Sequence, residues 1–187
     1  MQITAVDQYQ DLYQITDFCP ADFVEQIVKT DWLALSWRPQ DGQESWPRRR
    51  INDHELPWLD QWDQHCHAVW PQIANALGRK LKVYHSTAWW VDEPGFICKM
   101  HTDGEMPGAM QLCWIGAQNL GTSFYHYRNP ASLRYQFAMN ANTGYVMINS
   151  PDSVGARHLQ WHAMLNPVPK NTFRVTSYSW LAEETYD

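Results

Sequence analysis

Cysteine, positive charge and long apolar runs are all scarce in this 187-residue chain. The 4 cysteines stand far apart without a Cys-x-x-Cys pair, which argues against a zinc ribbon or a disulfide framework, so we expect free thiols. A formal charge of -6 provides no basic field for a phosphate backbone, and we expect no nucleic-acid partner. No apolar run approaches the roughly 18 residues of a membrane span, and residues 1–10 lack signal-peptide features. We therefore expect a cytoplasmic protein without membrane contact.

Aromatic side chains, which favour burial in a protein core, are abundant instead. Aromatic residues make up 14% of the chain, with 11 tryptophans, whereas charged residues make up only 18%. This composition excludes intrinsic disorder. The length fits one domain with a sizeable core, so we predict a single domain over residues 1–187.

The N-terminal part, residues 1–80, has a helical pattern. Pro20 suits a first helical turn, and the apolar spacing behind it predicts a short helix over residues 18–29. A longer helix is predicted over residues 57–77, with Gly78 as its stop. Its apolar stripe consists of Leu56, Leu59, Trp62, Cys66, Val69, Trp70, Ile73 and Leu77.

Residues 81–181 have a strand pattern instead, with short apolar runs broken by turn signals. No repeat recurs at a fixed period, which argues against a propeller or a solenoid. The pattern predicts an antiparallel sandwich that the N-terminal helices buttress. The expected strands are 82–91, 96–103, 110–115, 123–127, 133–139, 145–149, 160–165 and 173–181.

Chemistry-bearing residues occur at two places in this part of the chain. His101 and Asp103 are two residues apart, so on a strand their side chains would project from one face. An imidazole and a carboxylate are two members of the two-His-one-carboxylate set that binds non-heme Fe(II). Further along, His162 lies on a predicted strand, and Arg174 and Thr176 share one face of the last strand. This spacing suits a metal ligand followed by an anion clamp.

The order His101-x-Asp103, His162, Arg174-x-Thr176 resembles the Fe(II)- and 2-oxoglutarate-dependent dioxygenases, in particular their prolyl-hydroxylase-like branch. The likeness covers roughly residues 81–181. Thr122 stands where many members of the family have a second glycine, which is a departure from the family pattern. The flanking segments that carry the likeness are Trp89-Trp-Val-Asp-Glu-Pro-Gly95, Gly121-Thr-Ser-Phe124, Gly144-Tyr-Val-Met-Ile-Asn-Ser150 and His162-Ala-Met-Leu-Asn-Pro-Val168.

This resemblance implies a mostly β fold, a double-stranded β-helix or jelly roll over residues 81–181. It implies Fe(II) on His101, Asp103 and His162, with 2-oxoglutarate as cosubstrate and O2 as oxidant. Arg174 and Thr176 would bind the cosubstrate's distal carboxylate, because a guanidinium offers two parallel donors and a hydroxyl adds a third. The implied activity is hydroxylation of a small-molecule or peptidyl substrate, with succinate and CO2 as co-products and no catalytic residue beyond the metal ligands.

Several assignments stay open at this point. His158 is an alternative to His162, although His162 keeps the family's shorter separation from Arg174. Lys99 either meets the cosubstrate or reaches solvent. A tyrosine that assists the cosubstrate could be Tyr84, Tyr125 or Tyr127.

A second metal site at His65 and His67 is disfavoured, because helix positions i and i+2 diverge by about 200 degrees. Residues 36–55, with the run Arg48-Arg-Arg50, have no clear period and predict a long surface loop. This loop is either a solvated face or a lid that selects an anionic or peptide-like substrate. Residues 150–157 are a second candidate lid.

Two functions without catalysis compete with the dioxygenase hypothesis. One is a cupin-like binding module, and the other is a plain structural or interaction domain. The combination of all three ligand types with Arg174 favours the enzyme, because a domain without catalysis needs no anion clamp at that spacing. The sequence does not specify the substrate.

Overall fold

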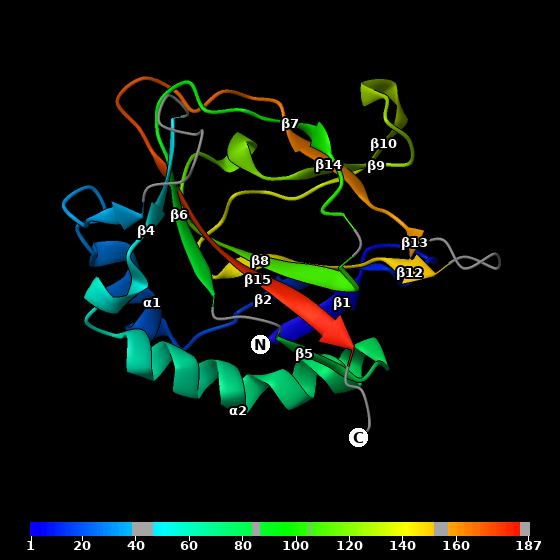
Figure 1. Ribbon diagram of the computed structural model, residues 1–187, viewed down its shortest axis with the longest axis horizontal. Helices are drawn as coiled ribbons and strands as arrows, with labels where there is room; N and C mark the ends of the chain where they lie inside the picture. Colours follow the sequence, from blue (N-terminus) through cyan, green and yellow to red (C-terminus); the bar gives the residue numbers. More distant parts are fainter. Residues whose placement is uncertain (39–46, 84–86, 105, 152–156, 184–187) are drawn as a thin grey trace.

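The structure is a computed structural model that describes residues 1–38, 47–83, 87–104, 106–151 and 157–183; for residues 150–151, 157–158 and 183 it describes the backbone alone. A larger and a smaller antiparallel sheet face each other, and helix α2 lies along the outer side of the larger sheet (Figure 1). This is the jelly-roll arrangement of a double-stranded β-helix. No described helix combines the length and apolarity that a bilayer span needs.

The larger sheet, which we call the major sheet, contains most of the strands. Strand β5 (Leu81–Val83) pairs with β15 outside the main path. In spatial order the main path is β1 (Gln2–Ala5), β2 (Leu12–Thr16), β11 (Thr143–Ile148), β8 (Gly108–Ile115), β15 (Arg174–Glu183), β6 (Ala88–Asp92), β4 (Arg48–Ile51) and β3 (Trp37–Arg38).

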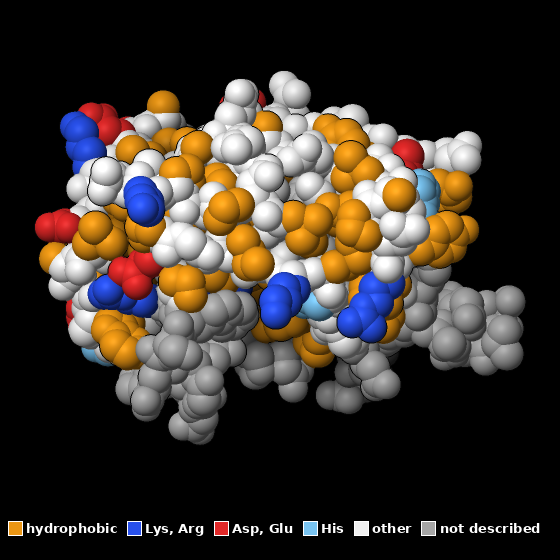
Figure 2. Space-filling view, turned by 90° about the horizontal axis from the view of Figure 1, so that it is seen from above, with side chains coloured by type: hydrophobic (Ala, Val, Ile, Leu, Met, Phe, Trp, Pro, Cys, Tyr) orange, Lys and Arg blue, Asp and Glu red, His pale blue; other side chains and the backbone are white. Residues whose placement is uncertain are grey.

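The smaller sheet, or minor sheet, has the order β10 (Leu133–Gln136), β9 (Ser123–Tyr125), β14 (Trp161–Met164), β7 (Cys98–His101). A short ribbon pairs β12 (Ser150–Pro151) with β13 (Arg157–His158). Seen from the minor-sheet side, the surface carries scattered apolar side chains with isolated charged groups between them (Figure 2). Exposed apolar residues that follow or begin minor-sheet strands are Tyr127, Leu133 and Leu165.

Both expected helices form. Helix α1 (Ala21–Lys29) follows Pro20, and α2 (Leu59–Leu77) ends at Gly78, whose φ of 61° is in the left-handed region that glycine tolerates best. The described residues also form three short 3-10 turns, η1 (Asp53–Glu55), η2 (Gln118–Leu120) and η3 (Pro130–Ser132).

The core between the helices and the major sheet is built on tryptophan. The rings of Trp62 and Trp89 lie 4.8 Å apart at their centroids, and those of Trp32 and Trp89 lie 5.4 Å apart. Trp58 is buried in the same cluster. Trp114 also packs here, 5.7 Å from Trp62, on the helix side of the sheet.

Strand alternation divides the major sheet into two faces. On β15 the odd-numbered Val175 and Leu181 enter the tryptophan core, whereas Arg174, Thr176 and Tyr178 point to the opposite side. The face turned away from the helices therefore carries the arginine, threonine and tyrosine of β15, and the minor sheet lies over it.

The N-terminal part differs from the expectation in one respect. Residues 1–80 contain strands as well as helices, because β1 to β4 add to the two edges of the major sheet. The three arginines of the expected loop at 36–55 form β4, and Arg49 pairs with Val91 of β6. Pairing with an existing strand supplies the order that the local sequence does not signal.

Candidate metal centre and its cavity

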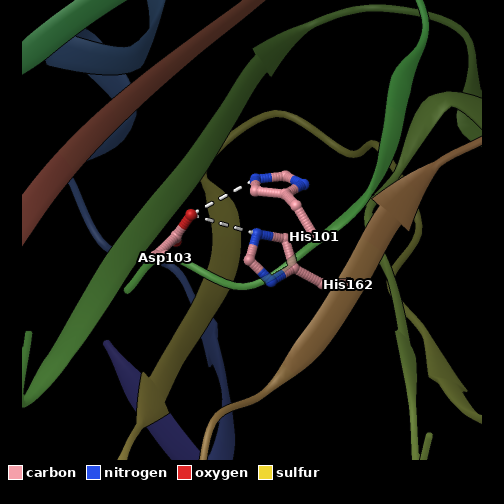
Figure 3. A group of neighbouring side chains, drawn as sticks. All are labelled: His101, Asp103 and His162. Atoms are coloured by element: carbon pink, nitrogen blue, oxygen red, sulfur yellow. Dashed lines mark ion pairs between the residues drawn. The ribbon is translucent and has the colours of Figure 1, made fainter. Parts of the chain in front are cut away.

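The side chains of His101, Asp103 and His162 converge between the two sheets. Their potential ligand atoms lie within 4.8 Å of one another. Asp103 Oδ1 is 3.3 Å from Nε2 of His101 and 3.5 Å from Nε2 of His162 (Figure 3). The structure thus brings together the three residues that the sequence analysis selected as metal ligands.

The pairing of β7 with β14 creates this convergence. His101 and His162 are direct cross-strand partners, and their ring centroids are 4.3 Å apart. Asp103 follows two residues after β7 ends, and Gly104 then turns the chain with a φ of 71°. The carboxylate therefore reaches the same point from a loop, and not from a continuing strand as the alternation argument assumed.

The two imidazoles are oriented by the same device. Nδ1 of His101 is 2.7 Å from the carbonyl oxygen of Lys99, and Nδ1 of His162 is 3.0 Å from that of Gln160. A carbonyl only accepts, so each Nδ1 carries the hydrogen and each Nε2 faces Asp103. In the neutral form of each ring this leaves the Nε2 lone pairs available to a cation.

Charge reinforces the cluster. The hydrogen bond with Asp103 raises the pKa of His101 to about 10. Burial opposes ionisation of Asp103, but its contacts with His101, His162 and Tyr178 outweigh the burial and hold the pKa of the carboxyl below its usual range. Without a metal, the site therefore contains an ionised carboxylate beside a protonated imidazole.

Tyr178 is a site residue that the sequence analysis missed. Its hydroxyl donates a hydrogen bond to Oδ2 of Asp103, the oxygen that does not face the histidines. Burial and the charge of Asp103 raise the pKa of Tyr178 well above its ordinary value, so it remains a donor. Its position two residues after Thr176 on β15 was the available signal, since the alternation that groups Arg174 and Thr176 includes it.

The segment Gly121-Thr-Ser-Phe124 packs against residues of the candidate metal centre and its cavity. A Cβ on Gly121 would lie 1.6 Å from the carbonyl oxygen of Phe137, so only glycine fits there. Phe124 stacks on the His162 ring with centroids 5.4 Å apart. Thr122, the departure from the family pattern, donates to Oε1 of Gln111 at 2.8 Å and so has a role of its own.

Arg174 is buried and already has an anionic partner. Its Nη1 donates to Oδ2 of Asp92 at 2.7 Å, while Nε of Arg48 lies 2.8 Å from the other oxygen, Oδ1. Asp92 is fully buried between the two guanidinium groups. Two guanidinium groups and one carboxylate leave this cluster with an excess of positive charge.

Four buried polar atoms of this cluster form no hydrogen bond with a described residue. Nε of Arg48 and Oδ1 of Asp92 still form the ion pair given above, whereas Nε of Arg174 and the hydroxyl oxygen of Thr176 have neither a hydrogen bond nor an ion pair among the described residues. Buried donors without acceptors cost free energy. Of Arg174 and Thr176, only Arg174 lines the cavity described below, because Thr176 is completely buried behind the cavity wall. Nη2 of Arg174 also donates to Gln111 at 3.3 Å, which orients the guanidinium.

A single cavity of about 390 Å³ joins the metal-ligating cluster to the arginine cluster. Aromatic rings of Trp90, Tyr178 and Trp180 form part of its wall. The other lining residues are Arg48, Arg50, Ala88, Cys98, His101, Asp103, Gln111, Thr122, Tyr145, His162, Met164 and Arg174.

The open assignments can now be compared with the structure. Lys99 is exposed and does not line the cavity, which agrees with the alternative that its side chain reaches solvent. Tyr125 and Tyr127 do not line the cavity, and Tyr84 is outside the described residues; the lining tyrosines are Tyr145 and Tyr178.

The other histidines and the second candidate lid either lie away from the cavity or fall outside the described residues. His65 Nε2 bonds the carbonyl of Phe18 at 2.8 Å while His67 is exposed, so they do not form a site. The side chain of His158 falls outside the described part, as do Trp46 and residues 152–156 of the second candidate lid.

No family model matches the sequence, and no curated protein sequence matches it. Solved structures match its fold. A viral collagen prolyl hydroxylase from Paramecium bursaria Chlorella virus-1, in its 2-oxoglutarate complex, is 12% identical with a TM-score of 0.61, covering 93% of this chain and 97% of that one. A Pseudomonas putida prolyl-4-hydroxylase is 14% identical with a TM-score of 0.60, covering 94% of each chain.

A third match has 2-oxoglutarate and nickel bound. It is HygX from Streptomyces hygroscopicus, 10% identical with a TM-score of 0.62, covering 97% of this chain and 89% of that one. At these identities the likeness concerns the fold. The chain has the double-stranded β-helix fold of the Fe(II)- and 2-oxoglutarate-dependent oxygenases, including their prolyl-hydroxylase-like branch.

Proposed function

We propose that this protein is a non-heme Fe(II)- and 2-oxoglutarate-dependent dioxygenase that hydroxylates a C–H bond of its substrate. One observation carries the proposal. The Nε2 atoms of His101 and His162 and the carboxylate of Asp103 meet in the same cavity as a buried guanidinium with an unpartnered donor.

The donor set fits Fe(II). Two imidazoles and one carboxylate on one side of the ion leave the other coordination positions open to cosubstrate and oxygen. When bound, iron, 2-oxoglutarate and O2 supply an oxidation that yields succinate, CO2 and hydroxylated substrate. The protein's part is to fix the ligands, which the Lys99 and Gln160 carbonyls do for the imidazoles and Tyr178 does for Asp103.

The arginine end of the cavity fits a carboxylate. The unpartnered Nε of Arg174 and the unpartnered hydroxyl of Thr176 are donors from one face of β15. A cosubstrate carboxylate in the cavity would contact the guanidinium of Arg174, which lines it, while Asp92 and Gln111 keep that guanidinium oriented. Thr176 does not line the cavity, so its hydroxyl would join the contact only after a shift of the side chains around it. Gln111 is held in turn by a second hydrogen bond, which the hydroxyl of Thr122 donates to its Oε1.

The walls would exclude water from the reaction. His162 and Arg174 are buried, and Trp90 and Trp180 are among the residues that line the cavity. A dry, pre-oriented site limits side reactions and strengthens each hydrogen bond made inside it.

Turnover of 2-oxoglutarate under air tests this function directly. Iron-loaded wild-type protein should form succinate even without added substrate, at a slow uncoupled rate. His101→Ala should abolish succinate formation, and Arg174→Gln should raise the KM for 2-oxoglutarate by about 10- to 100-fold, since it removes a charged hydrogen-bonding group. A folded, iron-binding wild-type protein without succinate formation would favour the cupin-like binding module instead.

A further inference from the structure

Arg50 is the cavity cation that the proposed chemistry leaves unused. Its side chain lines the same cavity as His101 and His162. It forms no ion pair or hydrogen bond with any residue that the structure describes. Both of its arginine neighbours in sequence have carboxylate partners, Asp92 for Arg48 and Glu93 for Arg49.

The register of β4 explains this difference. Arg48 pairs with Asp92 and Arg50 pairs with Trp90, so the two side chains share the cavity face, while Arg49 points to the other face. Nη2 of Arg49 lies 2.5 Å from Oε1 of Glu93, away from the cavity.

The charges of the cavity are otherwise accounted for. Asp92 compensates Arg48 and Arg174, and the proposed cosubstrate would supply a carboxylate to Arg174. Asp103 is engaged by the histidines and by Tyr178. The half-buried guanidinium of Arg50 therefore has room for an anionic partner, which a ligand in the cavity would supply.

We propose, as an extension of the dioxygenase function, that Arg50 binds a carboxylate of the substrate, and that the substrate is therefore a carboxylic acid. The planar guanidinium matches the two oxygens of a carboxylate. Trp90 and Trp180 line the same cavity and suit the apolar body of such an acid. A free carboxylic acid, a peptide C-terminus and an acidic side chain share this chemistry.

Matched acids and amides test the assignment. The probes are free and N-acetylated amino acids and small aromatic acids, each paired with its primary amide. Substrate-stimulated succinate formation by the iron-loaded protein is the readout. We expect acids to stimulate it and their amides not to. In Arg50→Gln the half-saturating concentration of an active acid should rise by about 10- to 100-fold, and Arg50→Lys should fall between.

Arg49→Gln is the matched control, because it removes the same group from the neighbouring position on the opposite face. It should leave stimulation by acids within about twofold of wild type, because the ion pair of Arg49 with Glu93 is partly exposed and contributes little. Circular dichroism of both variants checks that β4 still folds.

The inference would be overturned if amides acted as well as their acids, if no acid of the panel acted, or if Arg49→Gln and Arg50→Gln lost equal stimulation by acids. It would also be overturned if Arg50→Gln lowered the affinity for 2-oxoglutarate more than about tenfold, because Arg50 would then bind the cosubstrate. Failure of the dioxygenase function itself looks different, because wild-type protein would then form no chelate with iron and 2-oxoglutarate at all.

Discussion

Arg174 donates a hydrogen bond of 2.7 Å to Asp92, and both side chains are almost completely buried. The two residues are cross-strand neighbours on β15 and β6, so the pairing is built into the register of the major sheet. Asp92 also faces Arg48, which makes it the shared counter-ion of two cavity arginines. The residue proposed to bind the cosubstrate is thus held in place before any ligand arrives.

Removal of this counter-ion should be costly. Asp92→Asn leaves the buried guanidinium of Arg174 and the partly buried one of Arg48 without compensation, so the free energy of unfolding should fall by about 3 to 5 kcal/mol. Addition of 2-oxoglutarate with a metal should raise the melting temperature more in this variant than in wild type, since the ligand's charge replaces the lost carboxylate. Chemical denaturation and thermal melts measure both effects.

Glu93→Gln is the control for Asp92→Asn. It breaks the neighbouring Arg49 pair, whose side chains are 35% and 28% exposed, and should cost less than about 1 kcal/mol. Equal losses of stability in the two variants would contradict the role given to Asp92.

Tyr178 should matter to metal affinity without touching the metal. Tyr178→Phe removes the hydrogen bond to Asp103 Oδ2, and loss of such a supporting contact weakens metal binding by about 10- to 100-fold. Tyr125→Phe is the control, because Tyr125 is also buried on a strand but does not line the cavity. Titration with Co(II), followed by its visible spectrum, compares the two; similar affinities would show that Tyr178 does not orient Asp103.

Metal affinity should also rise with pH beyond neutrality. Asp103 raises the pKa of His101 to about 10, so the imidazole is protonated at neutral pH and a metal must displace its proton. The apparent affinity for Co(II) should therefore increase about tenfold per pH unit between about pH 7 and pH 9. An affinity that is constant above about pH 7 would indicate an imidazole with its ordinary pKa.

The choice between His162 and His158 as the third ligand has a simple test. His162→Ala should abolish Co(II) binding at micromolar metal, because it removes a nitrogen 3.5 Å from Asp103. His158→Ala should bind Co(II) with wild-type affinity. The reverse pattern would assign the site to His158.

Local patterns predicted the parts of the site that lie on regular strands. Alternation grouped Arg174 with Thr176, and the motif order selected His101 and His162, which the structure then pairs across β7 and β14. Tyr178 lay in the same alternation but was missed, since a tyrosine on a strand is ordinarily core.

Contacts between distant segments could not be predicted in this way. Asp92 meets Arg174 through pairing over 82 positions, and no local signal marks such a contact. Likewise Arg48, Arg49 and Arg50 have a loop-like composition and become a strand only because β6 offers an edge. The strands β1 and β2 were missed for the same reason, since their order depends on the edge of β11.

The most direct test of the proposed function is an anaerobic titration of the metal-free protein with Fe(II) and then 2-oxoglutarate. A chelate of both on His101, Asp103 and His162 should give a visible charge-transfer band in wild type, and the band should be lost in His101→Ala. Arg174→Gln should still give the band, but at about 10- to 100-fold higher 2-oxoglutarate. A folded wild-type protein that binds Fe(II) and gives no band at saturating 2-oxoglutarate would contradict the account.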